Sequence, residues 1–256
     1  MTIGIGFKCV DGIVICADTQ ITVEGSHTFY APKVWDYREP DDKWSVVFTY
    51  AGSVDLMDSF KDKLIRFLGD NEPATTLDLK DATEIVLNNM RSVAKRGLDM
   101  LGALCIPDKE LRMIKTSDRL VSNAADYEYV GAGDSSLLRC LADIVCTTRG
   151  PHYNHTSEQA VKIGTYLIQK AKRYTADSCG GDTEIFVLHS HGHHDVQSGR
   201  TKEIERQIID IEERLYPAVS LCFDMRISNS DVDQTWSTVL ELIKNYRGAT
   251  AVQSDQ

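Results

Sequence analysis

The sequence lacks the two features that would direct it to a membrane or across one. It contains no apolar run close to the ~20 residues needed to span a bilayer. Its first residues also lack the basic segment followed by an apolar segment that marks a signal peptide. We therefore expect a protein without a membrane segment that resides in the cytoplasm.

Positive charge is also scarce. The chain has 28 Lys and Arg residues against 38 Asp and Glu residues, which gives a formal net charge of -10. Binding to a phosphate backbone needs a surplus of cations that can neutralise it. We therefore expect no nucleic-acid partner.

Paired cysteines and clear metal ligands are missing as well. The seven Cys residues are scattered and form no CxxC pair, which is typical of free thiols in a reducing compartment. His189, His191 and His193 alternate, so they could share one face of a strand. Apart from the adjacent Asp195, however, no Cys or carboxylate lies at ligand spacing. We interpret this segment as an exposed strand end and expect no metal and no cofactor.

Short apolar β-like segments and amphipathic segments fill most of the chain. Strand patterns occur at 3–9, 13–17, 31–37, 43–51, 98–106, 110–116, 127–130 and 184–188. Helical patterns occur at 53–68, 79–96, 134–147, 156–174, 200–215 and 231–247. Runs of strands followed by runs of helices favour an α+β fold with two packed antiparallel sheets and helix layers outside. We expect a single domain over 1–256, in which 195–256 is a C-terminal extension of unknown role.

Six segments carry a resemblance to a known family. The opening TIGIGFKCVDGIVICADTQIT resembles the start of proteasome β subunits and of the bacterial protease HslV, with Thr2, Gly12 and Asp18 at the family's relative spacing. Asp18-Thr19-Gln20-x-Thr22 is similar to the family's Asp-small-Gln/Arg-Ala-Thr. PKVW is similar to the segment that carries the family's catalytic lysine, and FTYAGSVDLMDSF to its oxyanion loop. YEYVGAGDSSLL and ADSCGGDTEIFVL resemble two later loops. These matches cover roughly residues 2–190.

The resemblance implies a four-layer αββα sandwich, the N-terminal-nucleophile (Ntn) hydrolase fold, and a threonine peptidase. It places the catalytic residues at Thr2, Asp18, Lys33 and Gly52, with Asp177, Cys179 and Gly180 in support. The sequence departs from the family pattern at three later positions. Ala132 and Cys179 stand where the family often has Ser, and Asp177 lies one residue from the family Asp.

The chemistry of these residues is coherent in itself. If Met1 is removed, Thr2 carries both a hydroxyl nucleophile and an α-amine that can act as its base. The Lys33 ammonium lowers the pKa of that amine, and Asp18 keeps Lys33 charged and oriented. The backbone N–H of Gly52, at the start of a helix, can stabilise the tetrahedral oxyanion. The expected product is an acyl-enzyme ester that water hydrolyses.

The resemblance also implies a pocket for the side chain that precedes the scissile bond. Its expected lining residues are Gln20, Ile21, Thr22, Trp35, Tyr50 and Val54. An apolar lining favours an apolar substrate side chain, but Tyr50 could fill the pocket itself, and Tyr50 and Trp35 could equally be core residues.

The expected substrate is a peptide or unfolded protein, and the resemblance implies a homo-oligomeric ring with a possible ATPase partner. Two alternatives remain open at this point. The chain could be a non-catalytic structural subunit like the proteasome α subunits, or a small-molecule amidase on the same fold. Cys179 could in principle be a nucleophile, but no motif places a His beside it, and a buried free thiol is the commoner role for cysteine.

Overall fold

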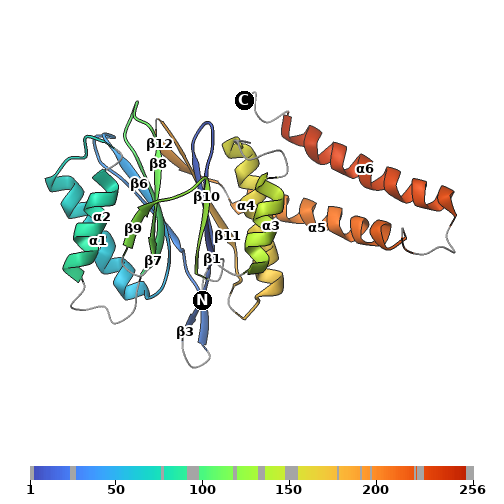
Figure 1. Cartoon of the computed structure of the whole chain (residues 1–256), viewed down its shortest axis with the longest axis horizontal. Coiled ribbons are helices and arrows are strands. Elements are labelled where there is room, and N and C mark those ends of the chain that lie inside the picture. The colour runs from blue at the N-terminus through green and yellow to red at the C-terminus, as the bar shows by residue number, and fades with distance from the viewer. Residues whose placement is uncertain are drawn as a thin grey trace. The chain divides into compact units, whose positions relative to one another are not determined.

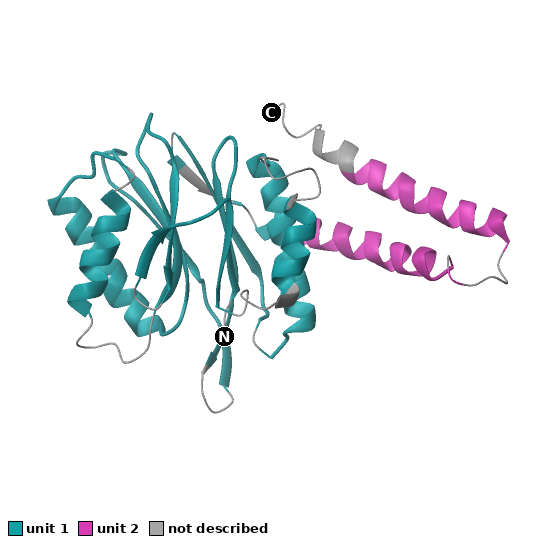
Figure 2. Ribbon diagram, in the orientation of Figure 1, with its two compact units in different colours: residues 1–201 teal, residues 202–256 magenta. Residues whose placement is uncertain are grey.

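The protein divides into two compact units, Met1–Thr201 and Lys202–Gln256 (Figure 2). The computed structural model describes all residues except a set of short segments. These are 1–2, 24–26, 76–77, 91–97, 118–119, 132–135, 148–154, 178, 191, 197, 222, 224–227 and 252–256.

The first sheet has the strand order β10-β1-β2-β11-β12, and every neighbouring pair is antiparallel. Its strands are β1 (Ile3–Lys8), β2 (Ile13–Asp18), β10 (Tyr127–Gly131), β11 (Thr183–His189) and β12 (Gly192–Asp195). β1 and β2 form the expected hairpin, with Gly4 opposite Ala17 and Lys8 opposite Ile13. Both strands are almost fully buried, which explains their continuous apolar sequences.

The second sheet has the order β5-β6-β7-β8-β9 and is also antiparallel throughout. Its strands are β5 (Val34–Arg38), β6 (Ser45–Ala51), β7 (Asp99–Cys105), β8 (Arg112–Ser117) and β9 (Leu120–Asn123). An apolar cluster joins it to the first sheet, with Ile15 and Ala17 from β2, Val34 from β5, Ala103 from β7 and Leu188 from β11. The two sheets therefore pack face to face.

Helices cover the outer faces of both sheets in the first unit (Figure 1). α1 (Val54–Asp70) and α2 (Asp78–Met90) pack on the second sheet, where Phe60 and Leu64 join Phe48 of β6 in one core. α3 (Ser136–Thr147) packs beside α4 (Ser157–Tyr174), which contacts β1, β2 and β11 of the first sheet.

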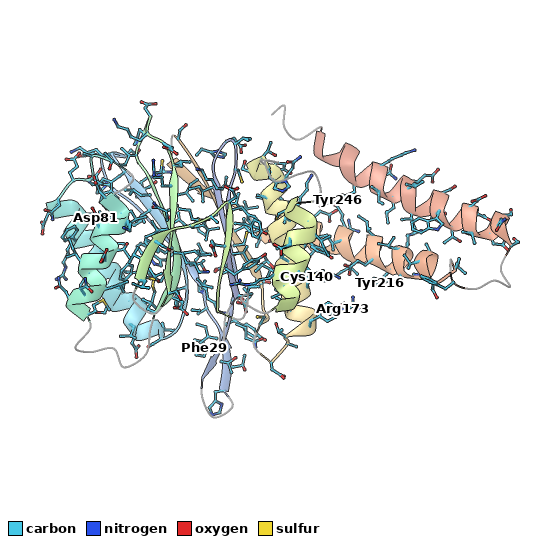
Figure 3. All side chains as sticks on the ribbon, viewed as in Figure 1. Phe29, Asp81, Cys140, Arg173, Tyr216 and Tyr246 are labelled. Atoms are coloured by element: carbon cyan, nitrogen blue, oxygen red, sulfur yellow. The ribbon has the colours of Figure 1, made fainter. Side chains whose placement is uncertain are left out.

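A two-stranded ribbon, β3 (Gln20–Val23) and β4 (His27–Tyr30), projects beyond the ends of the sheets (Figure 1). All four residues of β4 are exposed, and Phe29 retains 44% of its accessible surface (Figure 3). The sequence patterns did not predict this ribbon, because each strand has four residues and β4 is exposed throughout, so no apolar alternation is imposed.

The second unit consists of most of α5 (Ser198–Leu221) and of α6 (Asn229–Ala251). Several of its apolar side chains are exposed, among them Tyr216 at 47% (Figure 3) and Phe223 at 82%. None of the helices over the described ranges is long and apolar enough to cross a bilayer.

The prediction of an α+β chain with antiparallel sheets is confirmed. The expected capping box at α4 is present, since Thr156 Oγ1 accepts the Gln159 N–H and the Gln159 side chain accepts the Thr156 N–H. Ser53 occupies the N-cap position of α1 in an extended conformation, but its side chain makes no capping hydrogen bond. The expected helix 79–96 corresponds to α2, and its last part, 91–96, lies outside the described residues.

Candidate functional site

The Asp18 carboxylate lies at the end of β2 with none of its surface exposed, and four donors surround it. Its Oδ1 accepts the Ile3 backbone N–H at 3.1 Å and the Lys33 Nζ at 2.7 Å. Its Oδ2 accepts the N–H groups of Gly180 at 3.0 Å and Gln20 at 3.3 Å. A buried carboxylate is tolerated only when it is paired and hydrogen-bonded, and Asp18 satisfies both conditions.

Lys33 approaches Asp18 from the segment that precedes β5, and its side chain is only 1% exposed. Burial lowers the pKa of Lys33 below its ordinary value of 10.5, while the charge of Asp18 and its hydrogen bond oppose that shift. The ammonium is therefore held against the Asp18 carboxylate, and the predicted pairing of Asp18 with Lys33 exists in the structure.

The loop after α4 brings Cys179 and Gly180 to the same carboxylate. Besides donating to Asp18, Gly180 accepts the N–H groups of Thr19 at 3.3 Å and Gln20 at 3.1 Å through its carbonyl oxygen. Cys179 is 1% exposed, and burial raises the pKa of its thiol. A protonated, enclosed thiol is a poor nucleophile, which argues against the alternative that Cys179 attacks the substrate. Asp177, by contrast, is exposed in the turn that follows α4.

Gly52 lies between β6 and α1 and is exposed. Its φ angle is 137°, in the region that favours glycine because it has no Cβ. The glycine therefore permits the sharp turn that leads from the strand end into the helix.

Thr2 lies outside the described residues. Its neighbour Ile3 is fully buried, and the Ile3 N–H belongs to the peptide group that also contains the Thr2 carbonyl. That N–H donates to the Asp18 oxygen that also holds Lys33. One carboxylate oxygen thus ties the beginning of β1 to the lysine.

The expected pocket residues do not form one open surface. Trp35 and Tyr50 are 7% and 6% exposed and belong to the core beneath α1, where Trp35 stacks on Phe48 with ring centroids 5.4 Å apart. Gln20 is 7% exposed, and its Nε2 donates to the Ala176 carbonyl at 3.3 Å. The remaining three, Ile21, Thr22 and Val54, are partly or fully exposed.

The histidine segment forms the hairpin of β11 and β12, in which His193 lies opposite Leu188. His189 Nδ1 lies 2.9 Å from the Asp11 carbonyl oxygen, while His191 and the His193 side chain lie outside the described set. Over the part of the chain that can be described, no group of three metal-ligating side chains occurs.

Sequence reasoning missed two participants, the N–H groups of Ile3 and Gln20 that bind Asp18. Every residue except proline has a backbone N–H, so the residue type does not show which N–H groups bind Asp18. The only indirect signal is the polar Asp18 at the end of an otherwise apolar strand.

Comparisons with known proteins identify solved structures that share this fold. No family model matches the sequence, and no curated protein matches it either. Solved structures of Anbu do match. The Gly-1 mutant of Anbu from Hyphomicrobium sp. strain MC1 gives a TM-score of 0.69 at 12% identity, over 85% of this chain and 97% of that chain. Anbu from Yersinia bercovieri, described as an ancestral beta-subunit, gives 0.66 at 14% identity over 84% and 97% of the two chains. The helical assembly of the Anbu complex from Pseudomonas aeruginosa gives 0.62 at 16% identity over 83% and 96%.

These matches define the fold of the chain as that of the Anbu structures. They correct the assignment to proteasome β subunits and HslV, since the solved structures that give these scores are Anbu proteins. The assignment was wrong because the motifs that carried it describe tight turns and a buried Asp–Lys pair. Such features are tied to a fold and a site, and they do not separate one family on that fold from another.

Proposed function

We propose that this protein is an N-terminal threonine hydrolase that cleaves peptide bonds after removal of Met1. The observation that carries the proposal is the Asp18 Oδ1 atom, which binds the Ile3 N–H at 3.1 Å and the Lys33 Nζ at 2.7 Å. Thr2, which would bear the nucleophile, is covalently joined to Ile3. The Ile3 N–H and the Lys33 ammonium bind the same oxygen of Asp18.

In the proposed reaction, the neutral α-amine of Thr2 takes the proton of its own hydroxyl as Oγ1 attacks the substrate carbonyl carbon. The positive charge of Lys33 lowers the pKa of that amine and so increases its neutral fraction at working pH. The Gly52 N–H donates to the oxyanion of the tetrahedral intermediate. Collapse breaks the C–N bond, and the leaving amine takes the proton from the Thr2 ammonium. Water then hydrolyses the acyl ester.

The supporting residues have separate roles in this proposal. Gly180 holds the second oxygen of Asp18, and Cys179 fills the space beside the pair as a neutral thiol. Asp177, which is exposed, has no role in the chemistry. Ile21, Thr22 and Val54 contact the substrate, and Tyr50 and Trp35 close the pocket for the side chain before the scissile bond.

We further propose that the first unit has the four-layer αββα arrangement of Ntn hydrolases, with residues 195–256 as an extension of one domain. Copies of the chain associate in the cytoplasm into a homo-oligomer, closed as a ring or open as a helix. The open form is suggested by the helical assembly named for the Pseudomonas aeruginosa Anbu complex. An ATPase partner would deliver unfolded protein to such an assembly.

The test is the intact mass of the purified protein together with hydrolysis of fluorogenic peptide amides by wild type and Thr2→Ala. We expect a mass that lacks Met1 and turnover that the substitution abolishes. Thr156→Ala, which removes a hydroxyl from a helix cap, serves as the matched control and should keep its activity.

The three candidate functions give different results in this experiment. A retained Met1 with no turnover would contradict the proposal and favour a structural subunit. Turnover of simple acyl amides with none of peptides would favour the small-molecule amidase.

A further inference from the structure

Glu184 of β11 binds the backbone of the residue that carries the buried ammonium. Its Oε2 accepts the Lys33 N–H at 2.8 Å and the Val34 N–H at 3.2 Å. The contact joins the first sheet, to which Glu184 belongs, to the first residue of β5 in the second sheet.

Glu184 occupies a position in β11 where the alternation of side chains predicts an apolar residue. Alternate residues of a strand share a face, so Glu184 lies on the same face of β11 as Phe186 and Leu188. Those two side chains pack in the core between the sheets together with Val34. A carboxylate at the border of an apolar core is costly unless donors satisfy it, and the two N–H groups are such donors.

In the segment that precedes β5, the Ala31 N–H donates to the Thr19 carbonyl at 3.0 Å, and the next N–H groups along the chain, those of Lys33 and Val34, donate to Glu184. Residues 31–33 connect β4 to β5 without regular structure, and Pro32 has no N–H to donate. The pairing of β5 with β6 begins only at Val34, opposite Thr49. A carboxylate that accepts two successive N–H groups determines the backbone orientation at Lys33, and this orientation sets the direction in which the side chain leaves.

We propose that Glu184 is a positioning residue of the hydrolase site, which holds the backbone of Lys33 while Asp18 holds its ammonium. The two carboxylates come from adjacent strands, because Thr183 of β11 lies opposite Asp18 of β2 and Glu184 opposite Ala17. Lys33 is therefore anchored at both ends of its side chain. This inference rests on the function proposed above for Thr2.

The charge of Glu184 also acts on Lys33. Burial lowers the pKa of Lys33, and the carboxylates of Asp18 and Glu184 counteract that effect. Replacing Glu184 with a neutral residue should therefore let Lys33 lose its proton at a lower pH. A residue that merely supported the fold would not have this consequence.

The experiment compares Glu184→Gln with wild type in the hydrolysis of a fluorogenic peptide amide across pH. Gln keeps the size and an acceptor oxygen but removes the charge. We expect kcat to fall about tenfold, since small displacements of a catalytic group are costly, and KM to change by less than about twofold. The alkaline limb of kcat should move to lower pH, because the Glu184 charge no longer opposes the loss of the Lys33 proton.

Glu39→Gln is the matched control. Glu39 Oε2 likewise accepts two backbone N–H groups, from Asp41 at 2.8 Å and Lys43 at 3.2 Å, but it does so in an exposed turn. This variant should reproduce the wild-type kcat and pH profile. A second variant, Glu184→Asp, keeps the charge and shortens the reach by one methylene, so its kcat should fall while its alkaline limb stays at the wild-type pH.

The outcomes separate this inference from the proposed function. If wild type has no Thr2-dependent turnover, the proposed function fails. If wild type is active and the profiles of Glu184→Gln and wild type coincide, or kcat falls without a shift of the alkaline limb, the positioning role is overturned. Should Glu184→Gln not fold, Glu184→Asp decides, because wild-type kcat in that variant would contradict the requirement for two anchored ends.

Discussion

The Lys33 ammonium lies 2.7 Å from the Asp18 carboxylate, and both side chains are almost completely buried. Such a pair gains from a direct charge interaction in a low-dielectric interior, and it loses the hydration of both ions. The ammonium of a second lysine pair, Lys115 with Glu128 at 2.7 Å, remains partly hydrated, with exposed fractions of 19% and 25%. Substitutions in the two pairs can therefore be compared to measure what Lys33 contributes to stability and to turnover.

Lys33→Met should remove catalysis and destabilise the protein. Removing one partner of a buried pair leaves the other charge uncompensated, and this typically costs about 3–5 kcal/mol of folding free energy. We expect turnover to fall by at least about 100-fold, because the Thr2 amine loses the neighbouring charge that lowers its pKa. Peptide hydrolysis and urea unfolding provide the two measurements. Lys115→Met should lower the free energy of unfolding by about 1 kcal/mol or less and leave turnover unchanged. Equal losses of turnover in both variants would contradict the role assigned to Lys33.

The stability conferred by Lys33 should depend on pH in a direction fixed by its lowered pKa. Between the folded pKa and the unfolded value near 10.5, the unfolded chain binds more protons at Lys33 than the folded protein does. Stability therefore rises with pH in that window. Wild type should gain stability relative to Lys33→Met as pH increases towards 10.5, which denaturant unfolding at several alkaline pH values can measure. A difference that shrinks over this range would show that the pKa of Lys33 is raised.

Much of the fold was predictable because its strands and helices are long and periodic. The predicted bounds of β1, β2, β6 and α4 agree with the structure to within two or three residues, since their apolar patterns follow from burial on the sheet faces. The ribbon of β3 and β4 was not predictable, because its exposed residues carry no apolar pattern. The sequence set residues 195–256 apart as an extension of one domain but showed no linker, and the structure divides the chain at 201/202.

The site was predictable only where residue type carries the chemistry. Asp18 is a polar residue at the end of an apolar strand. Lys33 lies where the resembled family has its catalytic lysine, and the structure brings the two side chains together. Asp177 was assigned by its residue type alone, and the structure places it exposed in the turn that follows α4. The N–H groups of Ile3 and Gln20 are independent of side-chain type, and their binding to Asp18 appears only in three dimensions.

Cys179 should be chemically silent. Its thiol is buried and its pKa is raised by that burial, so alkylation of the folded protein at neutral pH should spare it and modify the exposed Cys140. Peptide mass spectrometry after brief iodoacetamide treatment measures both sites. Cys179→Ser should retain turnover within about threefold, since no bond is made to the sulfur. Rapid labelling of Cys179 that abolishes turnover would instead identify it as the nucleophile.

Gly52→Ala should impair catalysis more than stability. At a φ of 137° a Cβ is strained, and relief of about 1–3 kcal/mol of strain would turn the peptide N–H away from the proposed oxyanion position. Loss of one oxyanion donor typically lowers kcat by about 100- to 1,000-fold. Gly69→Ala is the matched control, because a Cβ at Gly69 meets no atom within 4 Å and that residue lies in the last turns of α1. The assignment of Gly52 fails if both variants turn over peptide amides at the wild-type rate.

Tyr50→Val should change the preferred substrate. Tyr50 is 6% exposed in β6, and under the proposed function it closes the pocket for the substrate side chain before the scissile bond. Wild type should therefore prefer peptides with a small residue at that position. Val keeps a strand-forming side chain, and the space it vacates should raise kcat/KM for Leu or Phe substrates relative to Ala substrates by about tenfold or more. The control is Tyr37→Val, which shortens a tyrosine of β5 that packs against Trp44. That variant should leave the ratio unchanged, and an unchanged ratio in Tyr50→Val would place the substrate pocket elsewhere.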